Sequence, residues 1–141
     1  MTRDEILAVL NRRTEAWRRL DVGALVADYA PNAVIESPLA GGTTQGLEQI
    51  KQVFQTYFVA FPDLGMEVGD VLVDGHRAAV MATFTGTDIG GFMGMPPTGR
   101  HVVIPVVFLY EFEDGKIVRD RRMYDFTGLL IQVGTLKAKP A

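Results

Sequence analysis

The chain has 141 residues, of which 48% are hydrophobic, and it carries 14 Lys and Arg against 17 Asp and Glu, for a formal net charge of −3. This length and apolar content predict one domain, 1–141, with a core large enough to fold without disulfides or a structural metal ion. The acidic balance argues against a nucleic-acid partner, and the absence of cysteine excludes disulfides, thiolate catalysis and cysteine metal sites.

Membrane and metal partners are also not expected. No stretch approaches the ~18 to 20 apolar residues of a membrane span, and the first residues include acidic side chains instead of an apolar targeting segment. We therefore expect a cytoplasmic protein with no membrane partner. The two histidines, His76 and His101, are far apart and too few to predict a metal centre.

The first half of the sequence predicts three helices and one strand. Residues 4–20 place apolar side chains at helical spacing, and a polar residue at either end of 2–4 is available as an N-cap. Residues 23–30 predict a second helix that ends before Pro31, because a proline disfavours the α conformation of the preceding residue. A short strand is expected in 32–42, and a third helix over 47–62.

The second half predicts strands joined by Gly-containing turns. The segments with strand character are 66–75, 77–88, 99–112 and 116–126. Between two of them, the loop 89–99 carries Phe92, Met93 and Met95, three large apolar side chains that suit either a lid over a pocket or a subunit contact. Residues 128–134 predict one helical turn, with Asp125 as its cap.

Helices followed by a strand meander indicate an α+β fold. We expect a curved antiparallel sheet wrapped around the N-terminal helices, which leaves a conical pocket for a small hydrophobic molecule. The strand 99–112 is apolar on both faces, and only one face can meet the helices. A homodimer through the sheet is therefore expected.

Alternation on the last strand predicts a functional face. Asp120, Arg122 and Tyr124 share one side of it, because successive strand residues point to opposite faces. A carboxyl group in a partly apolar pocket can transfer protons, while an arginine and a phenol can hold a developing oxyanion. The alternative is structural: Asp120 pairs with a neighbouring arginine on a solvated face, and the other two side chains pack.

The order of elements, with YAPNAVIESPLAGGTTQGLEQI early and GMPPTGRHV and EDGKIVRDRRMYDFTGLLIQVG late, resembles the NTF2-like (cystatin-like) superfamily and within it the SnoaL-like polyketide cyclase family. The resemblance implies cofactor-independent cyclase or isomerase chemistry, an intramolecular aldol reaction on a hydrophobic carbonyl compound. In that family an acidic side chain on the last long strand is the general acid and base, and Asp120 matches its position.

Two departures from better-defined relatives limit the alternatives. Ser37 stands where the resemblance to ketosteroid isomerases would require a catalytic aspartate, and a second acid would fall within the apolar residues 106–108. The Asp-Arg-Asp triad of the epoxide hydrolases of this superfamily would have to be rebuilt, for example from Asp120, Arg122 and Asp88.

The predicted site combines the last strand with the opposite wall of the pocket. Asp120 is the predicted catalytic residue, and the predicted substrate-binding residues are Arg13, Trp17, Ser37, Phe58, Val106, Phe108, Arg122 and Tyr124. For the aromatic side chains the alternative is plain core packing. The competing function is a binding protein that holds a lipid or aromatic metabolite without transforming it, because this fold also hosts proteins without chemistry.

Overall fold

The computed structural model describes residues 1–39 and 42–137, so residues 40–41 of the expected loop after the first strand lie outside it. In chain order its elements are α1 (Arg3–Arg18), α2 (Val22–Val26), β1 (Tyr29–Ser37), β2 (Gly42–Gln45), α3 (Leu47–Ala60), β3 (Gly65–Asp74), β4 (Arg77–Thr87), a 3-10 turn η1 (Phe92–Gly94), β5 (His101–Glu113), β6 (Lys116–Met123) and α4 (Phe126–Val133).

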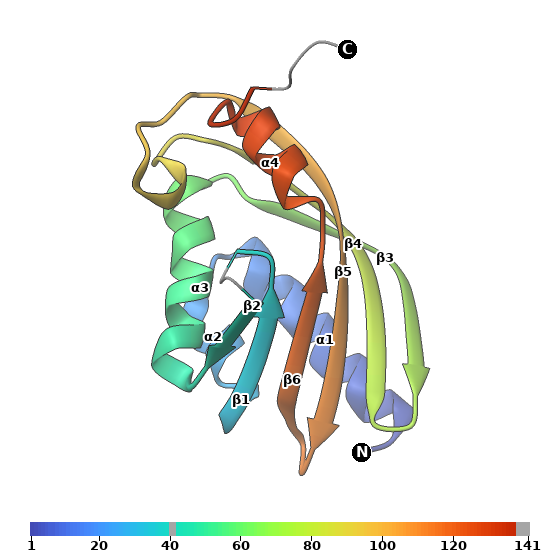
Figure 1. Cartoon of the computed structure of the whole chain (residues 1–141). Helices are drawn as coiled ribbons and strands as arrows, with labels where there is room; N and C mark the ends of the chain where they lie inside the picture. The colour runs from blue at the N-terminus through green and yellow to red at the C-terminus, as the bar shows by residue number, and fades with distance from the viewer. Residues whose placement is uncertain (40–41, 138–141) are drawn as a thin grey trace.

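The strands form one curved sheet in the order β2-β1-β6-β5-β4-β3. Helix α1 crosses its concave side, α3 stands beside β1 and β2, and α4 lies over the end of β5 and β6 (Figure 1). The predicted α+β fold with a sheet wrapped around the N-terminal helices is confirmed. One pair, β1 with β6, is parallel, whereas the other neighbours are antiparallel.

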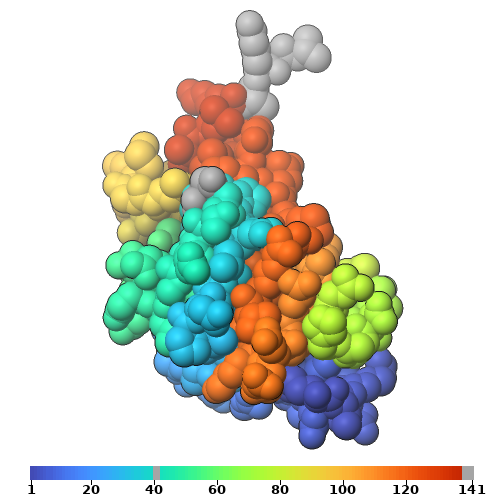
Figure 2. Space-filling model, turned by 60° about the horizontal axis from the view of Figure 1, so that its bottom comes forward, coloured from blue at the N-terminus to red at the C-terminus, as the bar shows by residue number. Residues whose placement is uncertain are grey.

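Helix α1 begins with a reciprocal cap. The Thr2 hydroxyl accepts from the Glu5 backbone N–H at 3.2 Å, and the Glu5 carboxylate accepts from the Thr2 N–H at 2.8 Å. The inward side of the helix buries Ile6, Leu10 and Trp17 against the sheet. In the space-filling view, the start of α1 in dark blue lies beside the β3–β4 hairpin in lime green (Figure 2). The cap and the buried apolar side of α1 together fix the position of this helix, which forms one wall of the expected pocket.

The second helix was predicted over 23–30, and its predicted end is wrong because α2 ends at Val26. Residues 29–31 belong to β1, where the backbone N–H of Ile117 donates to the Asp28 carbonyl at 2.8 Å. The parallel register shifts between Tyr29 and Val34, so the intervening proline, which has no N–H, falls in an irregular stretch. This shorter helix places the Tyr29 side chain beside β6.

Strand β6 divides its charged residues between two faces, as its alternation predicts. Arg119 and Arg121 point outward, where both bind Glu36 of β1, at 2.7 and 3.0 Å. Asp120 and Arg122 point inward and are buried. The inward charges are therefore separated by the sheet from the outward ion pairs.

The loop between β4 and β5 is held by a buried carboxylate. Asp88 accepts hydrogen bonds at 3.0 Å from the Gly91 N–H and from both the N–H and the hydroxyl of Thr98. Phe92, expected to serve a lid or a subunit contact, is instead a core residue: it is 1% exposed and packs on Tyr57 of α3, with ring centroids 5.7 Å apart. The anchored loop thus closes one end of the core.

Met93 and Met95 of the same loop are exposed, as expected. Asp125 caps α4 by accepting from the Gly128 N–H at 2.8 Å, which confirms its predicted structural role. Across the part of the chain that the structure describes, no helix has both the length and the apolar character needed to cross a membrane.

Candidate active site

A cavity of about 40 Å³ lies between the helices and the concave side of the sheet. It is lined by Trp17, Tyr57, Met66, Phe84, Ile104, Val106, Phe108, Arg122, Tyr124 and Leu129. These residues come from α1, α3, α4 and strands β3 to β6, apart from Tyr124, which directly follows β6. Both the helices and the sheet therefore contribute to the cavity wall. Seven of the ten side chains lack a charged or hydroxyl group, which suits a hydrophobic ligand.

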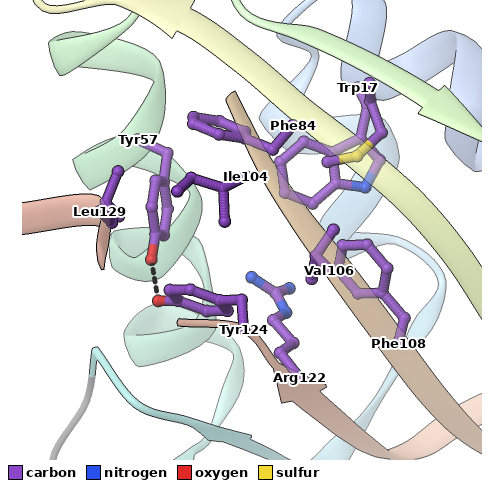
Figure 3. Close-up of a pocket in the computed structure, with 10 residues that line it drawn as sticks. Trp17, Tyr57, Phe84, Ile104, Val106, Phe108, Arg122, Tyr124 and Leu129 are labelled. Atoms are coloured by element: carbon purple, nitrogen blue, oxygen red, sulfur yellow. Dashed lines mark hydrogen bonds between the residues drawn. The ribbon is translucent and has the colours of Figure 1, made fainter. Parts of the chain in front are cut away.

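The polar groups on the cavity wall come from α3 and from the end of β6. The hydroxyls of Tyr57 and Tyr124 are hydrogen-bonded to each other across the cavity, and the Arg122 guanidinium points toward the space between Tyr124 and Val106 (Figure 3). Two phenols and a guanidinium that meet in an apolar space are suited to binding a carbonyl or enolate oxygen.

The Asp120 carboxylate lies one layer behind this wall. It is 0% exposed, and its Oδ2 accepts from the Tyr29 hydroxyl at 2.5 Å and from Arg122 Nη2 at 3.1 Å. Its Oδ1 has a single long contact, from Arg122 Nε at 3.5 Å. Oδ1 is therefore the oxygen with spare capacity to accept a proton, although the Arg122 side chain stands between it and the cavity.

The Arg122 guanidinium is held by both charge and aromatic faces. Burial lowers the pKa of Arg122, but attraction to the Asp120 carboxylate and to the Tyr29 oxygen outweighs it, so this pKa stands above its ordinary value. The guanidinium carbon lies 4.9 Å from the ring centre of Phe54 and 5.5 Å from that of Phe108. Arg122 is therefore a permanent cation at the cavity wall.

A second buried arginine supports Tyr29 from the other side. Arg13 Nη2 donates to the Tyr29 hydroxyl at 3.0 Å, and its Nη1 donates to Asp28 at 3.2 Å and to the Leu25 carbonyl at 3.0 Å. Burial raises the pKa of Tyr29 well above its ordinary value, so the phenol keeps its proton and donates a hydrogen bond to Asp120. The result is a continuous buried chain from Asp28 through Arg13, Tyr29 and Asp120 to the cavity.

The structure distributes the predicted site residues over three places. Those that line the cavity are Trp17, Val106, Phe108, Arg122 and Tyr124. Asp120 and Arg13 belong to the layer behind it. Phe58 packs on Trp17, with ring centroids 5.5 Å apart, and the Ser37 hydroxyl accepts from the Leu39 N–H at 3.2 Å. Phe58 and Ser37 are not among the residues that line this cavity.

Sequence reasoning missed the contact of Tyr29 with Asp120, because a predicted helix end gives no indication of a strand partner. The predicted substrate-binding residues also leave out five residues that line the cavity, Tyr57, Met66, Phe84, Ile104 and Leu129. Strand alternation would have signalled the inward side chains of β4 and β5. No pattern in the sequence marks Met66, which comes from the edge strand β3.

The second acid considered for a hydrolase triad, Asp88, is far from Asp120. The Asp88 N–H binds the Arg100 carbonyl, just before β5, whereas Asp120 pairs with Tyr110 near the other end of that strand. At ~3.4 Å per residue, the backbone partners of Asp88 and Asp120 are roughly 30 Å apart along the direction of β5. Asp88 therefore serves its loop and does not complete a triad. Within residues 1–39 and 42–137, no group of three His, Cys, Asp or Glu side chains is placed to hold a metal ion.

The chain matches the SnoaL-like polyketide cyclase family over residues 8–133 and belongs to it. The family, predicted by resemblance, is thus confirmed. Among solved structures, AclR from Streptomyces galilaeus is 29% identical with a TM-score of 0.85, over 99% of this chain and 87% of its own.

Two further solved structures show the same likeness. A SnoaL-like protein from Jannaschia sp. CCS1 is 25% identical with a TM-score of 0.82, over 97% of this chain and 94% of its own. IdmH from Streptomyces antibioticus is 29% identical with a TM-score of 0.75, over 90% and 96%. No functionally curated protein matches the chain.

Proposed function

We propose that this protein is an acid-base enzyme of the cyclase or isomerase type that works without a cofactor on a hydrophobic carbonyl compound, with Asp120 as the proton-transfer group. One observation carries the proposal: a buried carboxylate, fixed by Tyr29, lies directly behind a guanidinium that lines an apolar cavity. Membership of a family described as polyketide cyclases supports the same class of chemistry.

An intramolecular aldol reaction uses these groups in order. Oδ1 of Asp120 takes a proton from the carbon activated by a neighbouring carbonyl, and the electron pair moves onto that carbonyl oxygen to give an enolate. Arg122 and the hydroxyls of Tyr57 and Tyr124 hold the enolate oxygen. The enolate carbon then attacks a second carbonyl of the same molecule, a carbon-carbon bond forms, and the new alkoxide takes the proton back from Asp120.

Access to Asp120 requires movement of Arg122. The guanidinium now covers the carboxylate, and its contacts with Oδ1 are longer than a strong charged hydrogen bond. A substrate oxygen that binds Arg122 would draw its side chain toward the cavity and uncover Oδ1. Tyr29 would keep Oδ2 in place during this shift, because its 2.5 Å bond does not involve Arg122.

A second candidate function is binding without turnover. It is favoured by the position of Asp120, which is paired with an arginine and is not among the residues that line the cavity. In that case Arg122 would serve as the anion-binding group for an acidic hydrophobic metabolite, and Asp120 would only orient it.

The two functions are separated by assaying a panel of polyketide esters, ketosteroids and epoxides with the native chain and with Asp120→Asn. For an enzyme, the native chain converts at least one ester or ketone, and Asp120→Asn still binds it but turns it over about 10² to 10⁴ times more slowly. A native chain that binds panel members and converts none supports the binding function. Turnover that survives the substitution overturns the assignment of Asp120.

We also propose that the protein is a homodimer through the outer face of its sheet. Met81, Val107 and Met123 are in register across β4, β5 and β6, and with Val103 they form an apolar patch whose methionines and Val103 are 41–57% exposed. Sedimentation velocity tests this: Val107→Lys should give monomers, whereas the helix variant Gln52→Lys should not. A native chain that sediments as a monomer overturns the proposal.

A further inference from the structure

A second cavity of about 40 Å³ lies between α1 and strands β3, β4 and β5. Its own walls include Leu10 and Arg13 of α1 and Val80, Ala82 and Tyr110 of the sheet. Three residues, Trp17, Met66 and Phe108, line both this cavity and the first one. The two cavities are therefore separated by the thickness of a few side chains.

The two cavities follow each other along β5. The inward residues Ile104, Val106 and Phe108 line the first, and Phe108 and Tyr110 line the second. From Ile104 to Tyr110, at ~3.4 Å per residue, the combined space is roughly 20 Å long. In this register Phe108 pairs with Arg122, and Tyr110 pairs with Asp120. The Asp120–Arg122 pair thus lies beside the junction of the cavities.

Neither cavity suffices for a ligand of the proposed class by itself. Each has about 40 Å³, whereas pockets for molecules of drug size hold roughly 300 to 1,000 Å³. A carbonyl compound that can fold back on itself to close a ring must therefore displace side chains, and the dividing wall is the place where displacement gains the most space.

Of the three wall residues, all of them buried, Met66 has the most adaptable side chain. Trp17 packs edge-on against Phe54, at 5.2 Å between ring centroids, and Phe108 stacks on Tyr110 at 5.8 Å. Met66 has an unbranched, flexible side chain and projects from β3, the edge strand of the sheet. Rotation of this one side chain would join the two spaces.

The wall of the second cavity includes a hydrogen-bond donor, Arg13. Among the described residues, Nε of Arg13 is the buried side-chain nitrogen or oxygen atom without a hydrogen-bond partner, although both Nη atoms of the same guanidinium are bound. A buried N–H without an acceptor is unfavourable, so an acceptor brought by a ligand would be favoured there.

We propose that the two cavities are halves of one elongated site, separated by Met66, and that the site takes a linear acyl chain whose reacting carbonyls lie at Arg122. A further carbonyl a few atoms along the chain binds Arg13, which contacts the same Tyr29 hydroxyl as Arg122. The proposal rests on the proposed function and specifies its substrate class. Substrate size is then set by the second cavity, and Ala82, Val80 and Met66 determine the accepted chain length.

Binding of a chain-length series tests this proposal without any need for turnover. The protein is Asp120→Asn, and the probes are methyl esters of linear 3-oxo acids of increasing length. Trp17 is the only tryptophan and lies in the dividing wall, so its fluorescence reports binding directly. Affinity should rise about fourfold per added methylene until both cavities are filled. Affinity that is the same for short and long chains overturns the proposal.

A filled second cavity should abolish the length dependence. Ala82→Leu, and Val80→Phe as a second variant, add bulk to the second cavity alone. Each should lower the affinity for long chains at least tenfold and leave the affinity for short chains unchanged. Thr83→Leu, on the outward face of the same strand, is the matched control and should behave like the parent. Equal weakening of short and long chains would contradict the proposal, and the series on the parent decides the matter if both variants fail to fold.

A pair of probes of equal length tests the role of Arg13. One carries a further ketone a few atoms beyond the reacting carbonyls, and the other carries a methylene there. The ketone should bind at least about tenfold more tightly, as expected for a hydrogen bond to a charged donor. If the ketone probe binds more weakly than the methylene probe, Arg13 does not contact the ligand and this part of the proposal is wrong. All these measurements report affinity, so a failure of the proposed chemistry appears separately, as binding without turnover by the native chain.

Discussion

The Tyr29 hydroxyl donates a hydrogen bond of 2.5 Å to Oδ2 of Asp120, although the two residues lie 91 positions apart in the sequence. The parallel pairing of β1 with β6 brings them together. The bond fixes one carboxylate oxygen and leaves the other for proton transfer. Tyr29 is thus a positioning residue for the proposed catalytic group.

Removal of that hydroxyl should slow turnover without weakening ligand binding. Tyr29→Phe keeps the ring but takes the closest donor from Asp120, so we expect turnover to fall about 10- to 100-fold and the free energy of unfolding to fall by about 1.5 to 3 kcal/mol. Tyr110→Phe is the control, because it removes a buried phenol that makes no hydrogen bond to Asp120. Equal loss of turnover in both variants would contradict the positioning role.

Loss of one partner of the buried Asp120–Arg122 pair should lower the free energy of unfolding more than loss of both partners together. Arg122→Leu leaves a buried carboxylate without its cation and should lower the free energy of unfolding by about 3 to 5 kcal/mol, whereas Asp120→Leu combined with Arg122→Leu should recover part of this loss. Urea denaturation measures both. Arg121→Leu, which breaks an outward ion pair with Glu36, should change stability by about 1 kcal/mol or less. Additive losses in the double variant would rule out the coupling.

High pH should unfold the protein together with ionisation of its buried tyrosines. Burial is the largest cause of the raised pKa values of Tyr29, Tyr57 and Tyr110. Because these pKa values in the folded state exceed the unfolded value of ~10, the stability they contribute is fully present below pH ~10 and is lost as the pH rises further.

Tyrosinate absorbance and circular dichroism, followed together in an alkaline titration, check this expectation. Most of the tyrosinate signal should appear in one cooperative step with the loss of secondary structure. Gradual ionisation of all four tyrosines with the fold intact would contradict it.

The loop between β4 and β5 should depend on Asp88. Asp88→Ala removes the acceptor of three hydrogen bonds and releases Phe92 from its packing on Tyr57, so the free energy of unfolding should fall by about 2 to 4 kcal/mol. Thr98→Val keeps both backbone bonds to Asp88 and removes the bond that the Thr98 hydroxyl donates to Asp88 and the one that it accepts from the Arg100 N–H, so it should lose about 1 kcal/mol. Thermal denaturation of the two variants provides the comparison, and similar losses for both would show that Asp88 does not anchor the loop.

Most of the fold was predictable because its elements have strong local signals. The helical period of α1 and α3, the Gly-containing hairpin turns, the long apolar run of β5 and the alternation of β6 each fix an element from nearby residues. The sequence around Pro31 gave the wrong result, since the helical pattern of 23–30 continues past the point where pairing with Ile117 imposes a strand. Long-range strand pairing overrides local propensity there.

Of the site, only the polar residues of β6 and directly after it could be placed from the sequence. Alternation alone placed Asp120, Arg122 and Tyr124 on one face. It could not show that Asp120 lies behind Arg122 instead of beside it, because depth from a cavity depends on side-chain packing. Nor could it show the second cavity, whose dividing residue Met66 has no distinctive sequence context.

Proton abstraction itself is the most direct test of the account. Incubation of a hydrophobic 3-oxo ester in D₂O, followed by NMR, measures deuterium uptake at the carbon between its two carbonyls, above the uncatalysed rate. We predict that the native chain accelerates this exchange and that Asp120→Asn, which retains the shape of the side chain, lowers the acceleration by about 10² to 10⁴ while still binding the ester. Equal exchange by the two proteins would contradict the assignment of Asp120 as the base.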